Sequence, residues 1–156
     1  MTKDEAIFRI LMECEAQEIT DKNQIKYIIA TVEHETNGTF TPVREAYWLS
    51  ESWRKRNLRY YPYYGRGFVQ ITWKDNYEKF GKLLNIDLVN NPDLALDTDY
   101  AVFILVYGMK HGSFTGKKLC DYINCQKTDF VRARRIINGN DKAAHIARLA
   151  MKTELT

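Results

Sequence analysis

Apolar side chains recur at helical spacing in the first 35 residues of the chain. Thr2 and Glu5 have the spacing of a capping box, and the helix that follows is expected to end near Gln17. Asp21 is suited to cap a second helix that ends at Glu35. The apolar face of this second helix comprises Ile25, Ile28, Ile29 and Val32. The pattern therefore predicts two amphipathic helices at the N-terminus.

The periodic pattern is lost between Thr39 and Gly67 and returns afterwards. The segment 67–72, GFVQIT, indicates a short strand. Thr72 and Asp75 resemble another capping box, which predicts a helix with one apolar face. That face comprises Trp73, Tyr77, Phe80 and Leu84.

A turn at 90–92 precedes the most apolar helix of the chain, which begins at Thr98 or Asp99 and includes 101–107. Glycines then mark a loop: Gly108, Gly112 and Gly116. Shorter helices are expected at 117–123, 128–138 and 141–152. No repeat or interdomain linker is visible, so residues 1–156 are expected to form one mostly helical α+β domain.

Composition narrows the class of protein. The chain is 45% hydrophobic and 28% charged, as in ordinary globular proteins, and its net charge of +3 is too balanced to indicate nucleic acid. The N-terminus lacks the apolar core of a signal peptide, and the longest apolar run, 101–107, is too short to cross a bilayer. We therefore expect synthesis in the cytoplasm and no stable membrane insertion.

Cysteine and histidine are too scattered to indicate a metal site or a disulfide framework. His34 and Glu35 begin like the HExxH zinc signature, but Gly38 occupies the place of the second histidine. We expect no metal and no cofactor. The thiols of Cys14, Cys120 and Cys125 are expected to be reduced and buried in the packing.

Glu35 lies on the last turn of the second helix, at the edge of its apolar stripe. Partial burial and the negative end of the helix dipole both disfavour a charged carboxylate there and raise its pKa. A carboxylic acid kept protonated in this way can donate a proton, which makes Glu35 a candidate general acid. The alternative is a helix-end glutamate that points to solvent.

Glu45 follows beyond the turn at Gly38. Glycoside hydrolysis needs two carboxylates on opposite walls of a cleft: one protonates the leaving oxygen, and the other activates water or attacks the sugar. Glu35 and Glu45 are candidates for these roles. The alternative for Glu45 is a surface residue paired with Arg44 or a nearby lysine.

Aromatic, glycine and polar residues are concentrated at 60–73, YYPYYGRGFVQITW. Aromatic rings stack on sugars, while amide and guanidinium groups bind their hydroxyl and acetamido groups; a core cluster with a glycine turn is the alternative. Basic residues beside these rings also allow a nucleic-acid interpretation: Arg54, Lys55, Arg56, Arg59 and Arg66. The balanced net charge argues against it, and a cationic loop that faces an anionic polymer needs fewer assumptions.

Three segments resemble glycoside hydrolase family 19: HET at 34–36, YYGRGFVQITWKDNY at 63–77 and RRIINGNDKAAHIA at 134–147. The similarity extends over 25–151 and is to the short single-domain branch, which includes bacteriophage endolysins and bacterial wall lysins. It implies a lysozyme-like fold with a small antiparallel sheet beside the active-site cleft. The turns TNGT and INGN contain fewer glycines than the family pattern, which we expect to alter the shape of the groove.

The resemblance also implies roles for individual residues. Glu35 matches the general acid, and Thr72 matches the hydroxyl that holds the nucleophilic water. Glu45 matches the second carboxylate, with Glu51 in reserve because the segment before Glu45 is one residue longer than in the family. Substrate contacts are implied for His34, Tyr64, Arg66, Gln70, Asn76, Tyr77 and Asn138.

The implied activity is inverting hydrolysis of β-1,4-linked N-acetylhexosamine polymers. We expect the glycan strands of peptidoglycan to be the substrate, which would make the chain a monomeric muramidase-type endolysin with no nucleic-acid partner. It would act on the bacterial wall after release from the cell interior, with a holin as a possible lysis partner. A chitinase is the alternative within the same chemistry, and a glycan-binding module that has lost the reaction is another.

Overall fold

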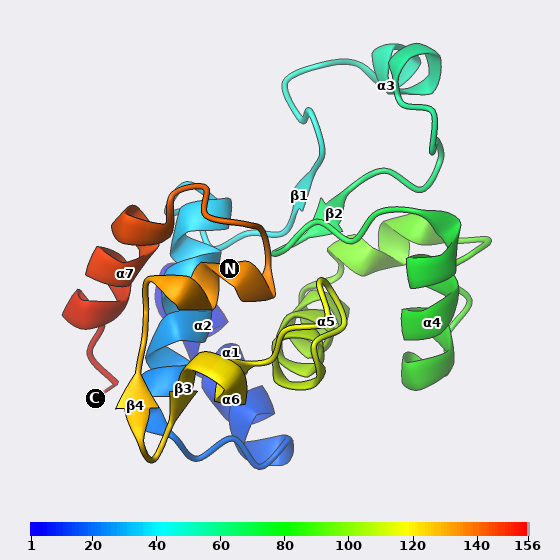
Figure 1. Cartoon of the computed structure of the whole chain (residues 1–156). Coiled ribbons are helices and arrows are strands. Elements are labelled where there is room, and N and C mark those ends of the chain that lie inside the picture. Colours follow the sequence, from blue (N-terminus) through cyan, green and yellow to red (C-terminus); the bar gives the residue numbers. More distant parts are fainter. Residues whose placement is uncertain (156) are drawn as a thin grey trace.

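Helix α2 (Lys22–Glu35) is the centre of the computed structural model, which describes residues 1–155 (Figure 1). Three further helices surround it: α1 (Lys3–Ala16), α5 (Thr98–His111) and α7 (Ala143–Lys152). Both predicted N-terminal helices are confirmed. Thr2 and Glu5 form the expected capping box, and the Asp21 carboxylate accepts from two backbone N–H groups at the start of α2.

Helix α5 divides the apolar interior into two clusters. Its Val102, Leu105 and Met109 pack in the larger cluster with α1 and α2. On its other side, Ile104 packs in a smaller cluster with Phe80 of α4 (Lys74–Leu84). The prediction of a strongly apolar helix that includes 101–107 is therefore confirmed, and α5 contributes to both apolar clusters.

The glycines after the apolar segment do not form one loop as expected. Gly108 lies inside α5, where a Cβ atom would come within 2.2 Å of the Phe114 ring. Gly112 ends the helix in the left-handed conformation, with φ of 75°. One glycine therefore permits close packing, and the next ends the helix.

The C-terminal third contains short elements before α7. They are α6 (Leu119–Tyr122), the antiparallel pair β3 (Ile123–Asn124) and β4 (Lys127–Thr128), and the 3-10 helix η2 (Arg132–Ile136). The helix expected at 128–138 is thus replaced by a strand and a 3-10 turn. The side chain of Asn124 accepts hydrogen bonds from the N–H groups of Gln126 and Lys127, which closes the hairpin that the helical pattern concealed.

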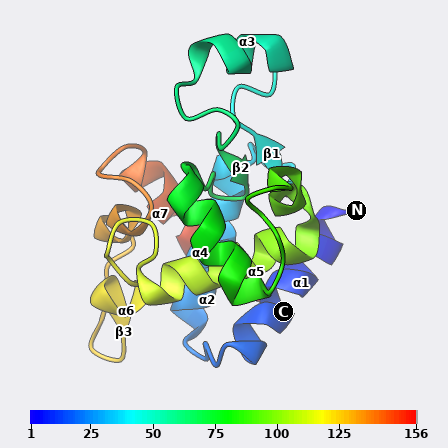
Figure 2. The ribbon, with the colours of Figure 1, turned by 90° about the vertical axis from the view of Figure 1, so that its right-hand side faces the viewer.

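Residues 43–67, here called the arm, project from the helical body (Figures 1 and 2). Its base is an antiparallel pair, β1 (Val43–Arg44) with β2 (Arg66–Gly67), and α3 (Glu51–Asn57) lies at its tip. Helix α3 was not predicted, because its seven residues carry no apolar stripe. The available signal was Ser50, whose Oγ accepts from the N–H of Trp53 as an N-cap.

The strand predicted at 67–72 is wrong beyond its first residue. Gln70 has a φ of 58°, which reverses the chain direction. The backbone of Ile71 therefore forms two hydrogen bonds with the backbone of Arg66. Helix α4 begins after Trp73 without a side-chain cap, so the predicted Thr72–Asp75 capping box is wrong as well. The Thr72 hydroxyl instead donates to the carbonyl of Gln70 at 3.2 Å.

The 3-10 helix η1 (Pro92–Leu96) follows the expected turn and leads into α5. Cys14 is buried as expected, whereas Cys120 and Cys125 are exposed, so burial of these two thiols was a wrong expectation. No helix within residues 1–155 is both long and apolar enough to cross a bilayer.

Thr36 fixes the chain directly after Glu35. Its buried hydroxyl donates to the carbonyl of Val32 at 2.7 Å and accepts from the N–H of Phe40 at 2.9 Å. Thr31 is also buried, and its hydroxyl donates to the Tyr27 carbonyl in the same manner, at 2.8 Å. Only Thr36, however, satisfies a buried backbone donor outside the helix.

We expect Thr36→Val to lower the free energy of unfolding by about 1–3 kcal/mol, because it leaves the Phe40 N–H without its acceptor. Thr31→Val is the matched control and is expected to change stability by less than about 1 kcal/mol, since it removes only a redundant helix bond. Urea unfolding of both variants measures the difference. Equal losses would refute the role of Thr36 as a tether.

Candidate active site

Glu35 ends helix α2, and its carboxylate meets a buried arginine from near the C-terminus. Arg134 Nη1 donates to Glu35 Oε1 at 2.8 Å, and the two side chains are 4% and 20% exposed, respectively. Within residues 1–155, no side chain donates a hydrogen bond to Oε2. Glu35 is therefore partly buried, as its position predicted, with one oxygen held and the other free for a ligand.

Arg134 also fixes the segment that follows it. Its Nε donates to the carbonyl of Asp141 at 2.8 Å, and its own carbonyl accepts from the N–H of Asn138 at 2.9 Å. Asn138 is exposed at this turn. The RRIINGN segment is thus attached to the end of α2, which brings Asn138 to the same side of the site as Glu35.

Glu45 lies at the base of the arm and is held on both oxygens. The N–H of Gly65 donates to Oε1 at 2.8 Å, and the hydroxyl of Tyr60 donates to Oε2. Burial, the hydrogen bond to Glu45 and the charge of that carboxylate raise the pKa of Tyr60 to about 12. The phenol therefore keeps its proton and acts as a fixed donor to Glu45.

Gly65 allows Glu45 and Gln70 to approach each other. A Cβ atom at position 65 would lie 2.7 Å from Gln70 Oε1 and 3.2 Å from Glu45 Oε1. Gln70 Nε2 donates to the carbonyls of Val43 at 2.8 Å and Gly67 at 3.2 Å. The Gln70 amide thus joins both strands at the base of the arm beside Glu45.

Thr72 and Asn76 continue this group on the body side. Asn76 Nδ2 donates to the Thr72 carbonyl at 2.7 Å, and both side chains are partly exposed. The Thr72 hydroxyl uses its proton on Gln70, which leaves its oxygen lone pairs able to accept from water. Thr72 is therefore linked to Gln70 by a hydrogen bond, and the Gln70 side chain lies close to Glu45.

Trp73 extends the same surface with an exposed ring. It is 47% exposed, and its ring centroid lies 5.0 Å from that of Tyr60. The Arg59 guanidinium lies 5.3 Å from the Trp73 ring. Gln70 and Trp73 have φ angles of 58° and 75°, and such left-handed non-glycine residues are costly and concentrate at functional sites.

Three residues with implied substrate contacts are buried instead. Tyr64, Arg66 and Tyr77 are 0%, 3% and 0% exposed. Arg66 Nη1 donates to the Tyr77 hydroxyl at 2.9 Å, and its guanidinium lies 3.8 Å from the centre of the Tyr64 ring. These three side chains therefore hold the arm in place. Because they are buried, the structure does not support direct contact between them and a glycan.

Glu51, the reserve candidate for the second carboxylate, belongs to a different set of hydrogen-bonded side chains within the arm. Its carboxylate accepts from Arg54 Nε at 2.9 Å and from the hydroxyls of Tyr61 at 2.9 Å and Tyr64 at 3.1 Å. Burial acts to raise the pKa of Glu51, but these hydrogen bonds outweigh it and hold the pKa below its ordinary value. Glu51 lines a separate cavity of about 810 Å³.

His34 lies beside Glu35 on the outer side of α2. Its ring centroid is 5.4 Å from that of His145 on α7. Burial lowers the pKa of His34, and the nearby positive charge of Arg134 adds to this effect against the opposing charge of Glu35. His34 is therefore neutral at pH 7. No cluster of His, Cys, Asp and Glu within residues 1–155 is arranged to hold a metal ion.

Asp93 of η1 anchors the arm to the body through two arginines. Arg44 Nη1 donates to Asp93 Oδ1 at 2.8 Å, and Arg66 Nε donates to the same oxygen at 3.0 Å. Burial acts to raise the pKa of Asp93, but the hydrogen bonds and charges of the two arginines outweigh it and hold the pKa below its ordinary value. Asp93 is therefore a pH-dependent link at the base of the arm.

We expect Arg134→Met to lower the free energy of unfolding by about 2–3 kcal/mol, because it leaves the Glu35 carboxylate without its ion-pair partner and the Asp141 carbonyl without its hydrogen-bond donor. Arg135→Met changes the exposed neighbour and should alter stability by about 0.5 kcal/mol or less. Urea unfolding at pH 7 compares them. Similar values for the two variants would contradict a structural ion pair at Glu35.

The pH dependence of the free energy of unfolding should show the lowered pKa of Asp93. An unfolded aspartate titrates near pH 3.9, and the folded one titrates lower, so the unfolded chain takes up this proton first as the pH falls. The contribution of Asp93 is complete above about pH 5 and is lost as the pH falls through the folded pKa. Asp93→Asn should therefore be less stable than the parent at pH 7 and lose less stability between pH 5 and 2.5.

Asp99→Asn serves as the control for this pH series. Asp99 pairs with Arg9 on the surface, where both side chains are largely exposed, at 74% and 46%. Urea unfolding at stepped pH should give Asp99→Asn the same pH profile as the parent. A parallel profile for Asp93→Asn would show that the arm is not held by this carboxylate.

Comparison with known proteins places this site in a family. The model of the class I chitinases, glycoside hydrolase family 19, matches residues 11–108. That range includes Glu35, Glu45 and the Gln70–Tyr77 segment, whereas Arg134 and Asn138 lie outside it.

Individual relatives cover less of the chain. Chitinase 11 of Oryza sativa subsp. japonica is 52% identical over 42 residues, which are 27% of this chain and 16% of that protein. Endochitinase A2 of Pisum sativum is 33% identical over 91 residues, covering 49% of this chain and 28% of that protein. The chain therefore spans less than a third of the length of either relative.

A solved structure shares the fold over almost the whole chain. A bacterial family 19 chitinase superposes with a TM-score of 0.65 and 22% identity, covering 98% of this chain and 88% of that one. Its lysozyme-like arrangement, mostly helical with a small antiparallel sheet, is the fold described above. Because the family model matches more than half of the sequence, this chain belongs to glycoside hydrolase family 19.

Proposed function

We propose that this chain is an inverting glycosidase that cleaves β-1,4 bonds between N-acetylhexosamines of peptidoglycan. The observation that carries the proposal is that two carboxylates are fixed by hydrogen bonds from different parts of the fold. Glu35 is held on the helical body by Arg134, and Glu45 is held at the base of the arm by Tyr60 and Gly65. One carboxylate has a free oxygen, and the other is a fixed acceptor, which suits an acid and a base.

In this proposal Glu35, which is ion-paired with Arg134 in the free protein, takes up a proton on Oε2 when the glycan binds and gives it to the glycosidic oxygen as the bond to the anomeric carbon breaks. Glu45 and the Thr72 hydroxyl orient a water molecule on the opposite face of the sugar. The water oxygen bonds to the anomeric carbon, and its proton passes to Glu45. Inversion requires room for this water, with the carboxyl groups about 6.5–9.5 Å apart in the complex.

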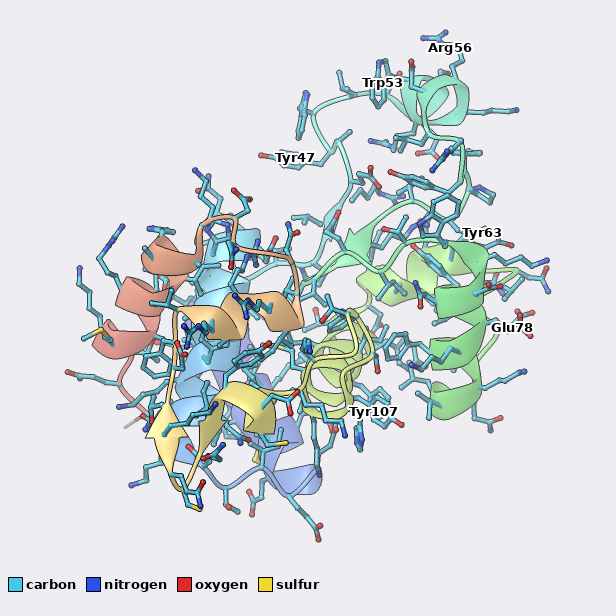
Figure 3. The ribbon with its side chains drawn as sticks, viewed as in Figure 1. Tyr47, Trp53, Arg56, Tyr63, Glu78 and Tyr107 are labelled. Carbon is cyan, nitrogen blue, oxygen red and sulfur yellow. The ribbon has the colours of Figure 1, made fainter. Side chains whose placement is uncertain are left out.

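Charge distribution supports an acidic polymer as the substrate. The arm contains six basic and two acidic residues, a net charge of +4, whereas the whole chain has +3, so the remainder carries −1. The arm also exposes aromatic rings: Tyr47 is 65% and Trp48 is 71% exposed, and Figure 3 shows Tyr47 pointing out from it. Bacterial walls carry carboxylates and phosphates that complement this surface, whereas chitin is neutral.

We extend the proposal to the place of action. The protein would act as a monomer on the wall after release from the cell interior, with a membrane-permeabilising partner of the holin type. The cationic arm suits adsorption to an anionic wall, and its net charge of +4 is the observation that favours an extracytoplasmic target.

Chitin hydrolysis is the second candidate, because the relatives that the sequence matches are named as chitinases. The acid, the base and the water would have the same roles on either polymer, since both contain β-1,4-linked N-acetylhexosamines. A glycan-binding module without turnover is the third, and the supported positions of Glu35 and Glu45 argue against it.

We expect the purified protein to release reducing ends from wall sacculi, and we expect Glu35→Gln to lose this activity by about 10²–10⁴-fold. Glu45→Gln should show a loss of similar size. Mass spectrometry of the products identifies the bond, and NMR of the first product formed should show the α-anomer. Glu78→Gln, an exposed change on α4, is the control and should keep parental activity.

Other outcomes decide between the candidates. Products from chitin hexamer alone would establish the chitinase and overturn the wall substrate. Binding of sacculi by both the parent and Glu35→Gln, with turnover by neither, would favour the binding module. Parental turnover by Glu35→Gln would exclude Glu35 as the acid.

A further inference from the structure

A second cavity opens on the other side of the last turn of α2. Its volume is about 650 Å³, and it lies between the end of α2 and the start of α7. His34 and Asn37 line one wall, and Lys142, His145 and Arg148 line the other. His34 directly precedes Glu35 on the same helical turn, so the cavity lies on the flank of the turn that carries the proposed acid, although the Glu35 side chain does not line it.

Positive charge predominates in this cavity. Lys142 and Arg148 are exposed, and neither forms an ion pair with another side chain in the described part of the chain, residues 1–155. Glu33 is the acidic residue of the lining. Two permanent cations against one carboxylate give the lining a net charge of +1 before any histidine is protonated. The cavity therefore attracts an anionic group.

The polar groups of the lining also suit amides. His34 is neutral at pH 7, so its ring offers one donor and one acceptor, and the Asn37 side chain offers both. Lys142 has a left-handed φ of 59°, a strained conformation that places this cation at the first residue before α7. Cations beside amide-binding groups match a short acidic peptide better than a neutral sugar.

We infer that this cavity binds the carboxylate-bearing peptide stem attached to the lactyl group of N-acetylmuramic acid. This inference rests on the proposed hydrolysis of peptidoglycan and names the feature of the substrate that distinguishes it from chitin. A glycan strand seated with its scissile oxygen at Glu35 presents its side groups to the flanks of α2, where His34 and Asn37 begin the cavity. Lys142 and Arg148 pair with the stem carboxylates.

The test is the double variant Lys142→Asn/Arg148→Gln. Asparagine tolerates the left-handed backbone at position 142, and position 148 is on the exposed face of α7, so the fold is expected to persist. We expect kcat/KM on sacculi to fall about tenfold, because the variant loses two exposed ion pairs with the substrate, while kcat/KM on chitin hexamer changes less than about twofold. Calorimetric binding of the disaccharide tetrapeptide should weaken to a similar extent.

The matched control is Lys117→Asn/Arg135→Gln, which removes the same charge from exposed positions outside the cavity. It should retain parental rates on both substrates. Equal loss on sacculi and on chitin hexamer in the cavity variant, or equal loss in the control, would overturn the cavity as the peptide site while leaving the hydrolase proposal intact. A parent protein that cleaves no sacculi would instead overturn the proposed function, and the binding experiment with the disaccharide tetrapeptide would still test the cavity.

Discussion

The geometry of the arm depends on one buried guanidinium, that of Arg66. It lies against the Tyr64 ring, donates to the Tyr77 hydroxyl of α4 and pairs with Asp93 of η1. Its Nη1 also donates to the Pro62 carbonyl in the segment of the arm that precedes β2. A buried cation is tolerated only when its donors are satisfied, so the GRG segment, α4 and η1 are constrained together. The position of Glu45 follows from this constraint, because its partner Gly65 directly precedes Arg66.

The sequence predicted the elements whose signals are local. The helices that carry Glu35 and the apolar core were expected from capping residues and from a 3.6-residue repeat, and the fold class followed from the motif resemblance. The partial burial of Glu35 was also expected from its place on the helix. The QITW segment was recognised as important, although its strand was not correct, because no periodicity reveals that Gln70 adopts a left-handed conformation.

The parts that could not be predicted depend on contacts between distant residues. Arg134 meets Glu35 across 99 positions of sequence, and nothing near either residue indicates the partner. Tyr64, Arg66 and Tyr77 stand within a motif that suggests sugar binding, and only packing shows that they are interior. Helix α3 is short and has no apolar face, so its one signal, Ser50, had too little context to be decisive.

The place of Glu45 on the arm has a mechanical consequence. The carboxylate is one residue beyond β1, next to the pivot about which the arm would bend, whereas the basic helix α3 lies at the far end (Figure 1). If the arm bends at this pivot, α3 moves a long way, whereas Glu45 hardly moves. A force applied to α3 would therefore leave the spacing between Glu45 and Glu35 nearly unchanged. The base of the arm, which carries Glu45, is thus mechanically insulated from its tip.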